Sequence, residues 1–424
     1  MNIIDVKTGT INSKRDIIVN GNTITSIIEH NNRNYKAETI IDGSKKYLIP
    51  GLIDTHAHPF LPLQSSLAQF THFGVTSILV PGGSSFNSDT FSDLRKRSMD
   101  NINASPRVKH TSPIFTMRGA HPVKTYTNNK WIDGETIIYI KDSLQIKSVI
   151  KELSKTEIIG IKVIIEDGPA PPYVDRIPQH YLNLIVEESR AYGLPVFAHV
   201  SDIEEVYMAE KADVQNIMHF VGVDIDWKDD IDLINKIIKK DISWATTLMI
   251  DKSFLYPLHP EWLNVTDIVK VYGKDSLNSL ITPEQIKFSK EFLNILKIDY
   301  NIENPNLENL IIPQVEDLMI LYEKGCNITI GTDNGNDFIL SGYSVHEEMQ
   351  LMELGGFKPK DILKMATHNG AKMLNEIDKL GTIEEGKFAD LILLNKNPLE
   401  SIKHTLTIDK VIKNGVVQKR IDNK

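Results

Sequence analysis

Short apolar runs rich in β-branched residues recur along the middle of this 424-residue chain, and they alternate with longer segments of helical period. This alternation is typical of βα units around a parallel sheet, in which each strand is buried on both faces. Eight runs have the length and composition of such strands: Leu52 to His58, Val75 to Val80, Val108 to Phe115, Ile158 to Ile165, Pro195 to Val200, Asn216 to Phe220, Ile242 to Thr247 and Asn327 to Thr332. Because a closed (β/α)8 barrel requires eight strands, the pattern predicts an α/β protein with a TIM barrel.

The segment between the last two predicted strands is longer than an ordinary connection. Residues 251–312 include helical stretches such as Pro283 to Leu296, and we predict that they form an insertion over the barrel mouth. Within it, Tyr256, His259 and Trp262 are equally consistent with contacts to a substrate and with packing inside the insertion.

Both ends of the chain have a different texture, in which short β-rich runs are separated by tight turns. The turn Asn20-Gly21-Asn22 lies between Asp16-Ile17-Ile18-Val19 and Thr23 to Ile28, which predicts a hairpin because Asn-Gly accepts positive φ. The tail repeats this texture from Ala389 to Leu394 and from Val411 to Val417. Both ends therefore look like parts of one small β domain.

The composition and charge of the chain limit the kinds of partner that we expect it to bind. A chain with 41% hydrophobic and 24% charged residues is typical of a soluble globular protein, and its net charge of -9 argues against nucleic acid as a partner. The single cysteine, Cys326, forms no intramolecular disulfide, and no run approaches the roughly 18 apolar residues of a membrane span. The first residues also lack an apolar signal core. We therefore expect a cytoplasmic protein with neither nucleic-acid nor membrane partners.

The strongest chemical signal is the stretch Pro50-Gly51-Leu52-Ile53-Asp54-Thr55-His56-Ala57-His58-Pro59. Side chains two residues apart share one face of a strand, so His56 and His58 point together toward the barrel axis and can chelate one metal ion. An isolated pair of this kind is as often an ordinary polar strand end. The interpretation therefore depends on other residues of the same rim.

Three further residues end predicted strands at the side where barrel enzymes place their chemistry. They are His199, His219 and Asp333. Taken alone, each histidine is typical of a satisfied core residue, and the aspartate of a turn or helix cap. Together with His56 and His58 they form a set of metal ligands.

Lys162 lies inside the apolar run Ile158 to Ile165, where a charged ammonium is costly and burial favours the neutral amine. A neutral amine adds carbon dioxide to give a carbamate, whose two oxygens can bridge two cations. The alternative is a lysine that extends its amine to solvent at the strand end. The histidines and the aspartate on the same rim favour the carbamate.

These motifs make the chain similar to the amidohydrolase superfamily, and within it to the binuclear branch with a carboxylated lysine, which includes prolidase-like dipeptidases and imidazolonepropionase-like members. The resemblance implies six metal ligands: His56, His58, Lys162, His199, His219 and Asp333. The stretch from Gly381 to Asp390 is similar to the family's return into its small domain. The resemblance thus implies a β-sandwich domain of residues 1–50 plus 381–424 beside a barrel of residues 51–380.

The loop Arg118-Gly119-Ala120-His121-Pro122 is similar to a Gly-Gly-His stretch of dipeptidase-like members, although Ala120 stands where that subgroup often has glycine. Arg118 is a candidate for binding a substrate carboxylate, His121 for contacting substrate near the metals, and Tyr173 for lining the pocket. Incidental surface roles are equally consistent with all three positions. The resemblance further implies a small-molecule substrate and a homo-oligomer.

The resemblance implies hydrolysis of an amide-type C–N bond in a dipeptide, an N-acyl amino acid or a cyclic amide. A hydroxide bridging two divalent ions would attack the carbonyl carbon, while Asp333 would take its proton and deliver it to the leaving nitrogen. Zinc suits imidazole and carboxylate ligands best, and manganese, cobalt or iron also fit. The alternatives are a lactonase or phosphotriesterase at the same binuclear site, and a barrel that has lost catalysis and acts as a scaffold.

Overall fold

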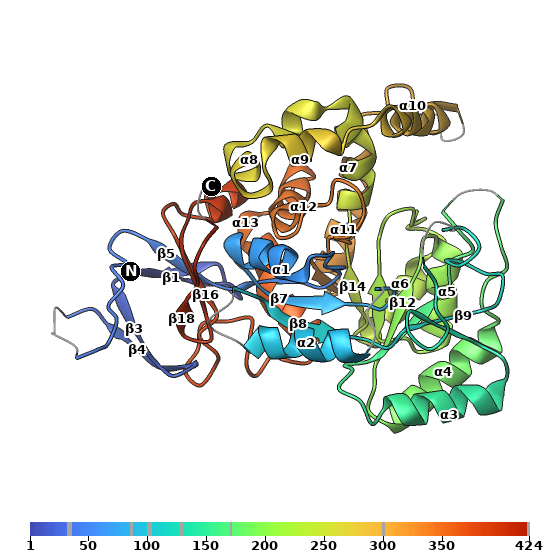
Figure 1. Ribbon diagram of the computed structural model, residues 1–424, viewed down its shortest axis with the longest axis horizontal. Coiled ribbons are helices and arrows are strands. Elements are labelled where there is room, and N and C mark those ends of the chain that lie inside the picture. Colours follow the sequence, from blue (N-terminus) through green and yellow to red (C-terminus); the bar gives the residue numbers. More distant parts are fainter. Residues whose placement is uncertain are drawn as a thin grey trace.

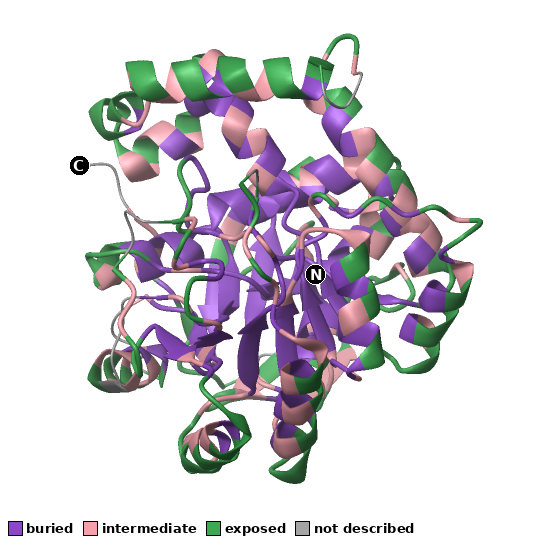
Figure 2. Cartoon of the chain, turned by 90° about the vertical axis from the view of Figure 1, so that its right-hand side faces the viewer, coloured by how far each residue is buried: buried purple, intermediate pink, exposed green. Residues whose placement is uncertain are grey.

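The computed structural model describes residues 1–31, 36–84, 88–99, 104–126, 130–169, 172–298 and 302–421. Parallel strands form its centre, helices surround them, and a sheet built from both ends of the chain lies to one side (Figure 1). Figure 2 shows the central strands as buried and the outward faces of the surrounding helices as exposed.

The centre consists of two parallel sheets. The three-stranded sheet has the order β6 (Leu52–Asp54), β7 (Val75–Val80) and β8 (Arg107–His110). The seven-stranded sheet has the order β10 (Ile137–Tyr139), β9 (Ile114–Thr116), β11 (Ile161–Ile164), β12 (Val196–His199), β13 (Asn216–Met218), β14 (Ser243–Ala245) and β15 (Asn327–Thr329). Nearly every residue of these strands is buried, which explains why their sequences are continuous apolar runs.

Backbone hydrogen bonds also join the two sheets to each other. At one seam Thr55 N donates to Ile330 O at 2.9 Å, just beyond the ends of β6 and β15. At the other seam Ile159 N, ahead of β11, donates to His110 O of β8 at 2.9 Å. These bonds bring the carboxyl ends of strands from both sheets to one rim.

One predicted strand is wrong in its extent, because Val108 to Phe115 forms two strands, β8 and β9, rather than one. Pro113 lies between them and has no backbone N–H to donate to a ladder, so the strand is interrupted there. The run Leu52 to His58 is also shorter as a regular strand, since β6 ends at Asp54 and Ala57 forms only an isolated bridge to Asn334.

The helices around the sheets present apolar residues inward at helical spacing. In α6 (Ile231–Lys239), for example, Leu233, Ile234 and Ile237 are buried. The other helices of this layer are α1 (Leu63–His72), α2 (Ser88–Met99), α3 (Ser143–Leu153), α4 (Gln179–Ala191), α5 (Ile203–Lys211), α11 (Leu307–Glu323), α12 (Tyr343–Leu354), α13 (Pro359–Lys364), a π-helical turn η3 (Met365–Asn369) and α14 (Gly370–Met373). Within the described ranges, no helix has the length and apolarity needed to cross a membrane.

The connection from β14 to β15 is an extended helical segment, drawn mostly in yellow in Figure 1. Ahead of α11 it contains α7 (Met249–Leu255), η1 (Tyr256–Leu258), η2 (Pro260–Leu263), α8 (Thr266–Tyr272), α9 (Lys274–Ser279) and α10 (Pro283–Ile298). Tyr256 is fully buried, with the ring of Trp262 at 5.3 Å, and His259 stacks on Trp262 at 4.4 Å. His259 and Trp262 therefore pack within the segment, whereas Tyr256 also stacks on Phe338 at 5.6 Å and donates its hydroxyl to Glu347, both outside it.

Strands from both chain ends share one sheet, as Figure 1 shows at its left. Its order is β18 (Val416–Val417), β17 (Ile408–Lys413), β16 (Leu391–Leu394), β5 (Tyr47–Pro50), β1 (Asn2–Asp5) and β2 (Thr10–Asn12), and η4 (Ile402–Leu406) precedes β17. The predicted hairpin is confirmed as β3 (Arg15–Asn20) and β4 (Thr23–Glu29), which pair antiparallel. Gly21 has a φ of +59° in its turn, a conformation that glycine adopts without a Cβ penalty.

Candidate metal centre

Two histidines that follow β6 meet an aspartate that follows β15. His56 Nε2 lies 3.2 Å and His58 Nε2 lies 3.4 Å from Asp333 Oδ1, and the three ligand atoms lie within 4.8 Å of one another. Burial opposes ionisation of Asp333, but the hydrogen bond from His58 and the nearby charged groups outweigh it, so the pKa of Asp333 lies below its ordinary value. The group therefore offers two imidazoles and a carboxylate.

Asp54 holds the backbone next to the group formed by His56, His58 and Asp333. Its fully buried carboxylate accepts hydrogen bonds from His56 N at 3.1 Å and from Thr332 N and Oγ1 at 3.1 and 2.6 Å. Burial raises the pKa of Asp54 to about 7. The contacts connect the end of β6 to the end of β15 and thereby fix the backbone that carries His56 and Asp333.

Five imidazoles follow one another along the rim. The successive ring-centroid distances are 5.6 Å from His121 to His199, 4.1 Å to His219, 4.4 Å to His56 and 5.3 Å to His58. Burial lowers the pKa of His56, His199 and His219 well below the ordinary range. These three imidazoles are therefore neutral, which is the form that binds metal ions.

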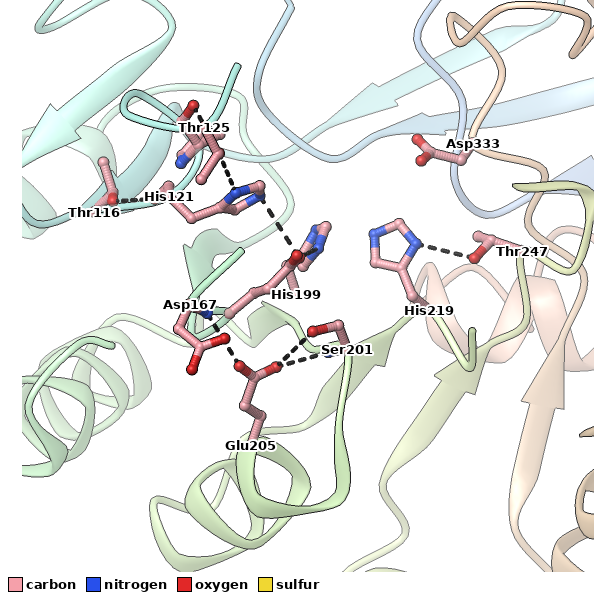
Figure 3. A network of polar contacts seen from close by, with 12 residues as sticks. Thr116, His121, Thr125, Asp167, His199, Ser201, Glu205, His219, Thr247 and Asp333 are labelled. Atoms are coloured by element: carbon pink, nitrogen blue, oxygen red, sulfur yellow. Dashed lines mark hydrogen bonds and ion pairs between the residues drawn. The ribbon is translucent and has the colours of Figure 1, made fainter. Parts of the chain in front are cut away.

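His219 is held in the orientation of a ligand. Its Nδ1 lies 2.9 Å from Thr247 Oγ1, whereas its buried Nε2 has no hydrogen-bond partner. Figure 3 shows the ring between Thr247 and His199. A hydrogen bond on one ring nitrogen is the usual way in which proteins orient a metal-binding imidazole.

Lys162 on β11 is 2% exposed, and within the described part of the chain its Nζ has no hydrogen-bond partner. Burial lowers its pKa to about 7 even though Asp333 and Glu166 oppose the shift. A large share of the side chain is therefore a neutral amine near neutral pH, as the sequence predicts.

A second group of ligand atoms was missed in the sequence analysis because Glu166 was overlooked. Glu166, just after β11, is 4% exposed, and its Oε2 contacts His199 Nε2 and lies 3.6 Å from His121 Nε2. Burial raises the pKa of Glu166 and lowers that of His121. A signal was present, since Lys162 and Glu166 are four residues apart and share one face of an extended chain.

The other two predicted substrate contacts lie outside this cluster. Arg118 is exposed, and its guanidinium lies over the ring of Tyr139 at 4.4 Å from the centroid. Tyr173 is 58% exposed. Their role in binding substrate stays a prediction.

A third carboxylate group, Asp167, Asp202 and Glu205, is paired with a single arginine, Arg176. Arg176 lies 3.0 Å from Glu205 and 3.1 Å from Asp167, and it also pairs with Asp202. Glu205 accepts hydrogen bonds from Asp167 N and Ser201 N, as Figure 3 shows. This network ties the loop after β11 to the start of α5, so it positions the loop that carries Glu166.

The donor set fits divalent metal ions. Nitrogen and oxygen ligands about 2.1 Å from a tetrahedral ion lie about 3.4 Å from one another, and the distances of His56 and His58 to Asp333 are close to this spacing. Among the described residues the buried Lys162 Nζ and His219 Nε2 have no hydrogen-bond partner, and both side chains interact electrostatically with Asp333. Imidazole-rich sites with carboxylates suit zinc and neighbouring first-row metals.

Comparison with known proteins agrees with this chemistry. The model of the amidohydrolase family matches residues 47–417. The 5'-deoxyadenosine deaminase of Methanocaldococcus jannaschii is 22% identical to this chain. The alignment covers 99% of this chain and 94% of that protein. The 5-methylthioadenosine/S-adenosylhomocysteine deaminase of Halalkalibacterium halodurans is 22% identical, with 86% of this chain and 76% of that protein covered.

Among solved structures, a Xaa-Pro dipeptidase with methionine bound in its active site superposes with a TM-score of 0.71. It is 22% identical, and the match covers 99% of this chain and 98% of that chain. The likeness shows a TIM-barrel-like α/β fold with an additional domain.

Proposed function

The chain belongs to the amidohydrolase family and is a hydrolase that acts on C–N bonds, and from this premise we propose that it cleaves an amide-type C–N bond at a binuclear metal site. The substrates are a dipeptide, an N-acyl amino acid or a cyclic amide. The observation that carries the proposal is the buried amine of Lys162, which has no hydrogen-bond partner among the described residues and lies among neutral histidines and carboxylates.

The proposed architecture is a closed (β/α)8 barrel of residues 51–380 with an insertion at 251–312, beside a β-sandwich domain of residues 1–50 plus 381–424. The backbone hydrogen bonds at the two seams between the parallel sheets support closure of the barrel. The sheet that combines β1, β5 and β16 supports a domain made from both chain ends.

In the proposed site, His56, His58 and Asp333 would hold one ion, and His199 and His219 would hold the other. Lys162, carboxylated by carbon dioxide, would supply the carboxylate shared by both. Zinc is the expected metal, and manganese, cobalt or iron(II) would fit the same ligands. When bound, two such ions would lower the pKa of a water toward 7 and polarise the substrate carbonyl.

Asp333 has the position and the charge of a proton carrier. Its carboxylate is ionised and lies at the rim, so it accepts a proton from the attacking water and delivers it to the departing nitrogen. The hydrogen bonds of His219 with Thr247 and of His121 with Thr125 keep these imidazoles preorganised.

Deamination of an adenosine-type substrate is the second candidate, because relatives that align with nearly the whole chain are 5'-deoxyadenosine deaminases. Deamination at a single metal ion needs no bridging carboxylate. It would therefore leave the cost of burying the Lys162 amine unmet. A lactonase or phosphotriesterase would use the same bridged pair. Parallel assays with dipeptides and N-acyl amino acids, with adenosine derivatives, and with aryl lactones and phosphotriesters distinguish these substrates.

The first experiment is the metal content of the purified protein and of Lys162→Ala prepared under the same conditions. We expect about two ions per chain in the wild type, and a fall in both metal content and activity in the variant. One ion or none in the wild type, unchanged by the substitution, would refute the bridged site.

A further inference from the structure

Glu166 brings a carboxylate to the side of the rim opposite Asp333. It follows β11, whereas His199 ends β12 and His121 lies in the connection between β9 and β10. The ligand atoms of these three residues lie within 4.8 Å of one another. Figure 3 shows His121 and His199 turned toward a common point.

The hydrogen bonds of His121 determine which of its ring nitrogens faces Glu166 with a lone pair. Thr125 Oγ1 lies 2.6 Å from His121 Nδ1 and 3.3 Å from Pro122 O. When the hydroxyl donates to the Pro122 carbonyl it accepts from Nδ1, and in that tautomer the ring carries its proton on Nδ1. Its Nε2 lone pair then faces the Glu166 oxygen at 3.6 Å, which places two acceptors against each other with no hydrogen bond between them.

A divalent ion accounts for this arrangement. Two imidazole nitrogens and one carboxylate oxygen are the protein ligands of one common class of catalytic zinc site. The 3.6 Å separation of His121 Nε2 and Glu166 Oε2 is close to the spacing of about 3.4 Å between ligands of a tetrahedral ion. The group also repeats the composition of His56, His58 and Asp333.

We propose that Glu166 and His121 bind, together with His199, the second divalent ion of the site. Each of the two ions then has a carboxylate of its own, Asp333 for the first and Glu166 for the second. This inference rests on the proposed binuclear function and extends it, because the ligand set implied by the sequence contains neither Glu166 nor His121.

Metal affinity, rather than turnover, tests the proposal. Metal-free wild type and Glu166→Gln are titrated with Zn²⁺ in competition with a chromophoric chelator, and bound zinc is then counted after desalting. Glutamine matches glutamate in size but lacks the negative charge. We expect the wild type to bind two zinc ions. In Glu166→Gln, the affinity for one ion should be unchanged and the affinity for the other should be weaker by about 100-fold or more.

Two further variants provide an independent test and a control. Thr125→Val removes the hydroxyl that sets the His121 tautomer and should weaken the same ion by about 10-fold or more, even if Glu166→Gln fails to fold. Glu210→Gln is the control, because Glu210 is a buried glutamate of α5 that pairs with Lys240 rather than with the rim. It should bind zinc as the wild type does.

The outcomes separate this inference from the proposed function. Two ions bound with unchanged affinities in both Glu166→Gln and Thr125→Val would overturn the role of Glu166 and His121 and leave the binuclear site intact. A wild type that binds fewer than two ions would overturn the binuclear site itself, and this inference with it.

Discussion

Asp251 offers a test of how burial and pH act together in the segment between β14 and β15. This residue of α7 is 7% exposed, and its carboxylate accepts a hydrogen bond from Gln314 Nε2 of α11 at 2.7 Å. Burial raises its pKa from 3.8 to about 6. We predict that Asp251→Asn stabilises the protein at neutral pH.

The magnitude follows from the linkage between protonation and folding. As the pH rises above 3.8, the unfolded chain releases this proton while the folded chain keeps it until about pH 6, so folding stability falls across this window. The complete shift corresponds to about 3 kcal/mol, and about half of that penalty is present at pH 5. An asparagine side chain carries no such penalty at any pH.

A hydrogen bond adds to the expected gain. Gln314 Oε1 is buried and has no partner, and the amide introduced by Asp251→Asn could donate to it if the two side chains reorient. A newly satisfied buried acceptor contributes about 1 kcal/mol. The loss of one negative charge in the first turn of α7 offsets up to about 1 kcal/mol. The net expectation is about 3 to 4 kcal/mol at pH 7.5 and clearly less at pH 5.

Urea denaturation at the two pH values, followed by circular dichroism, measures this difference. Asp232→Asn is the matched control, because Asp232 lies outside the core in the first turn of α6, and its change should be within about 0.5 kcal/mol at both pH values. A destabilised Asp251→Asn, or a gain that is the same at pH 5 and pH 7.5, would refute the burial argument.

Three other substitutions probe the rim and the junction of the sheets. Asp333→Asn should lower kcat by about 100-fold or more, because it removes the proton carrier. Steady-state assays measure this on protein whose metal content is matched to the wild type. Thr247→Val removes the partner of His219 Nδ1, so zinc affinity in a chelator competition should fall about 10- to 100-fold, and an unchanged affinity would contradict the orienting role. Asp390→Ala strands the buried guanidinium of Arg107, which pairs with it at 2.8 Å, and should lower the free energy of unfolding by about 3 to 5 kcal/mol in urea titrations. A loss below about 1 kcal/mol would show that water reaches Arg107.

The pattern of apolar runs was sufficient to predict the parallel strands and the rim, because buried strands are apolar on both faces and end at the side where polar ligands begin. The structure brings His56, His58, Lys162, His199, His219 and Asp333 together at that rim. The interruption at Pro113 was also visible in the sequence, since proline cannot donate to a central ladder. Its effect was overlooked because the run around it remained apolar.

The proximity of Glu166 to His121 could not be predicted in the same way. These residues lie in two loops that follow different strands, and their contact depends on how the loops fold over the rim rather than on any local period. The ion pairs of Arg176 with Asp167 and Glu205 position one of these loops. Such pairs between distant residues have no signature in a single sequence.

Three of the ten described non-glycine residues with positive φ lie at the rim where the site is proposed. His219, Thr247 and Asp333 have φ values of +75°, +63° and +57°, and each such backbone costs about 1 to 3 kcal/mol for a residue other than glycine. They follow β13, β14 and β15, which are neighbours in the sheet. Strain at three adjacent strand ends indicates that the fold holds side chains in place for binding rather than for its own stability.

The buried lysines also differ in whether they serve the stability of the fold or the proposed site. Lys387 donates to Ile377 O at 2.6 Å and to Thr382 Oγ1 at 2.6 Å, and Lys413 donates to Ser98 O. A lysine that serves only the fold is thus given oxygen acceptors, because an unpaired buried amine is costly. Lys162 is buried like Lys387 and Lys413, yet among the described residues its Nζ has no acceptor. Carbon dioxide together with two metal ions, as we propose, would supply the partners that a buried amine requires.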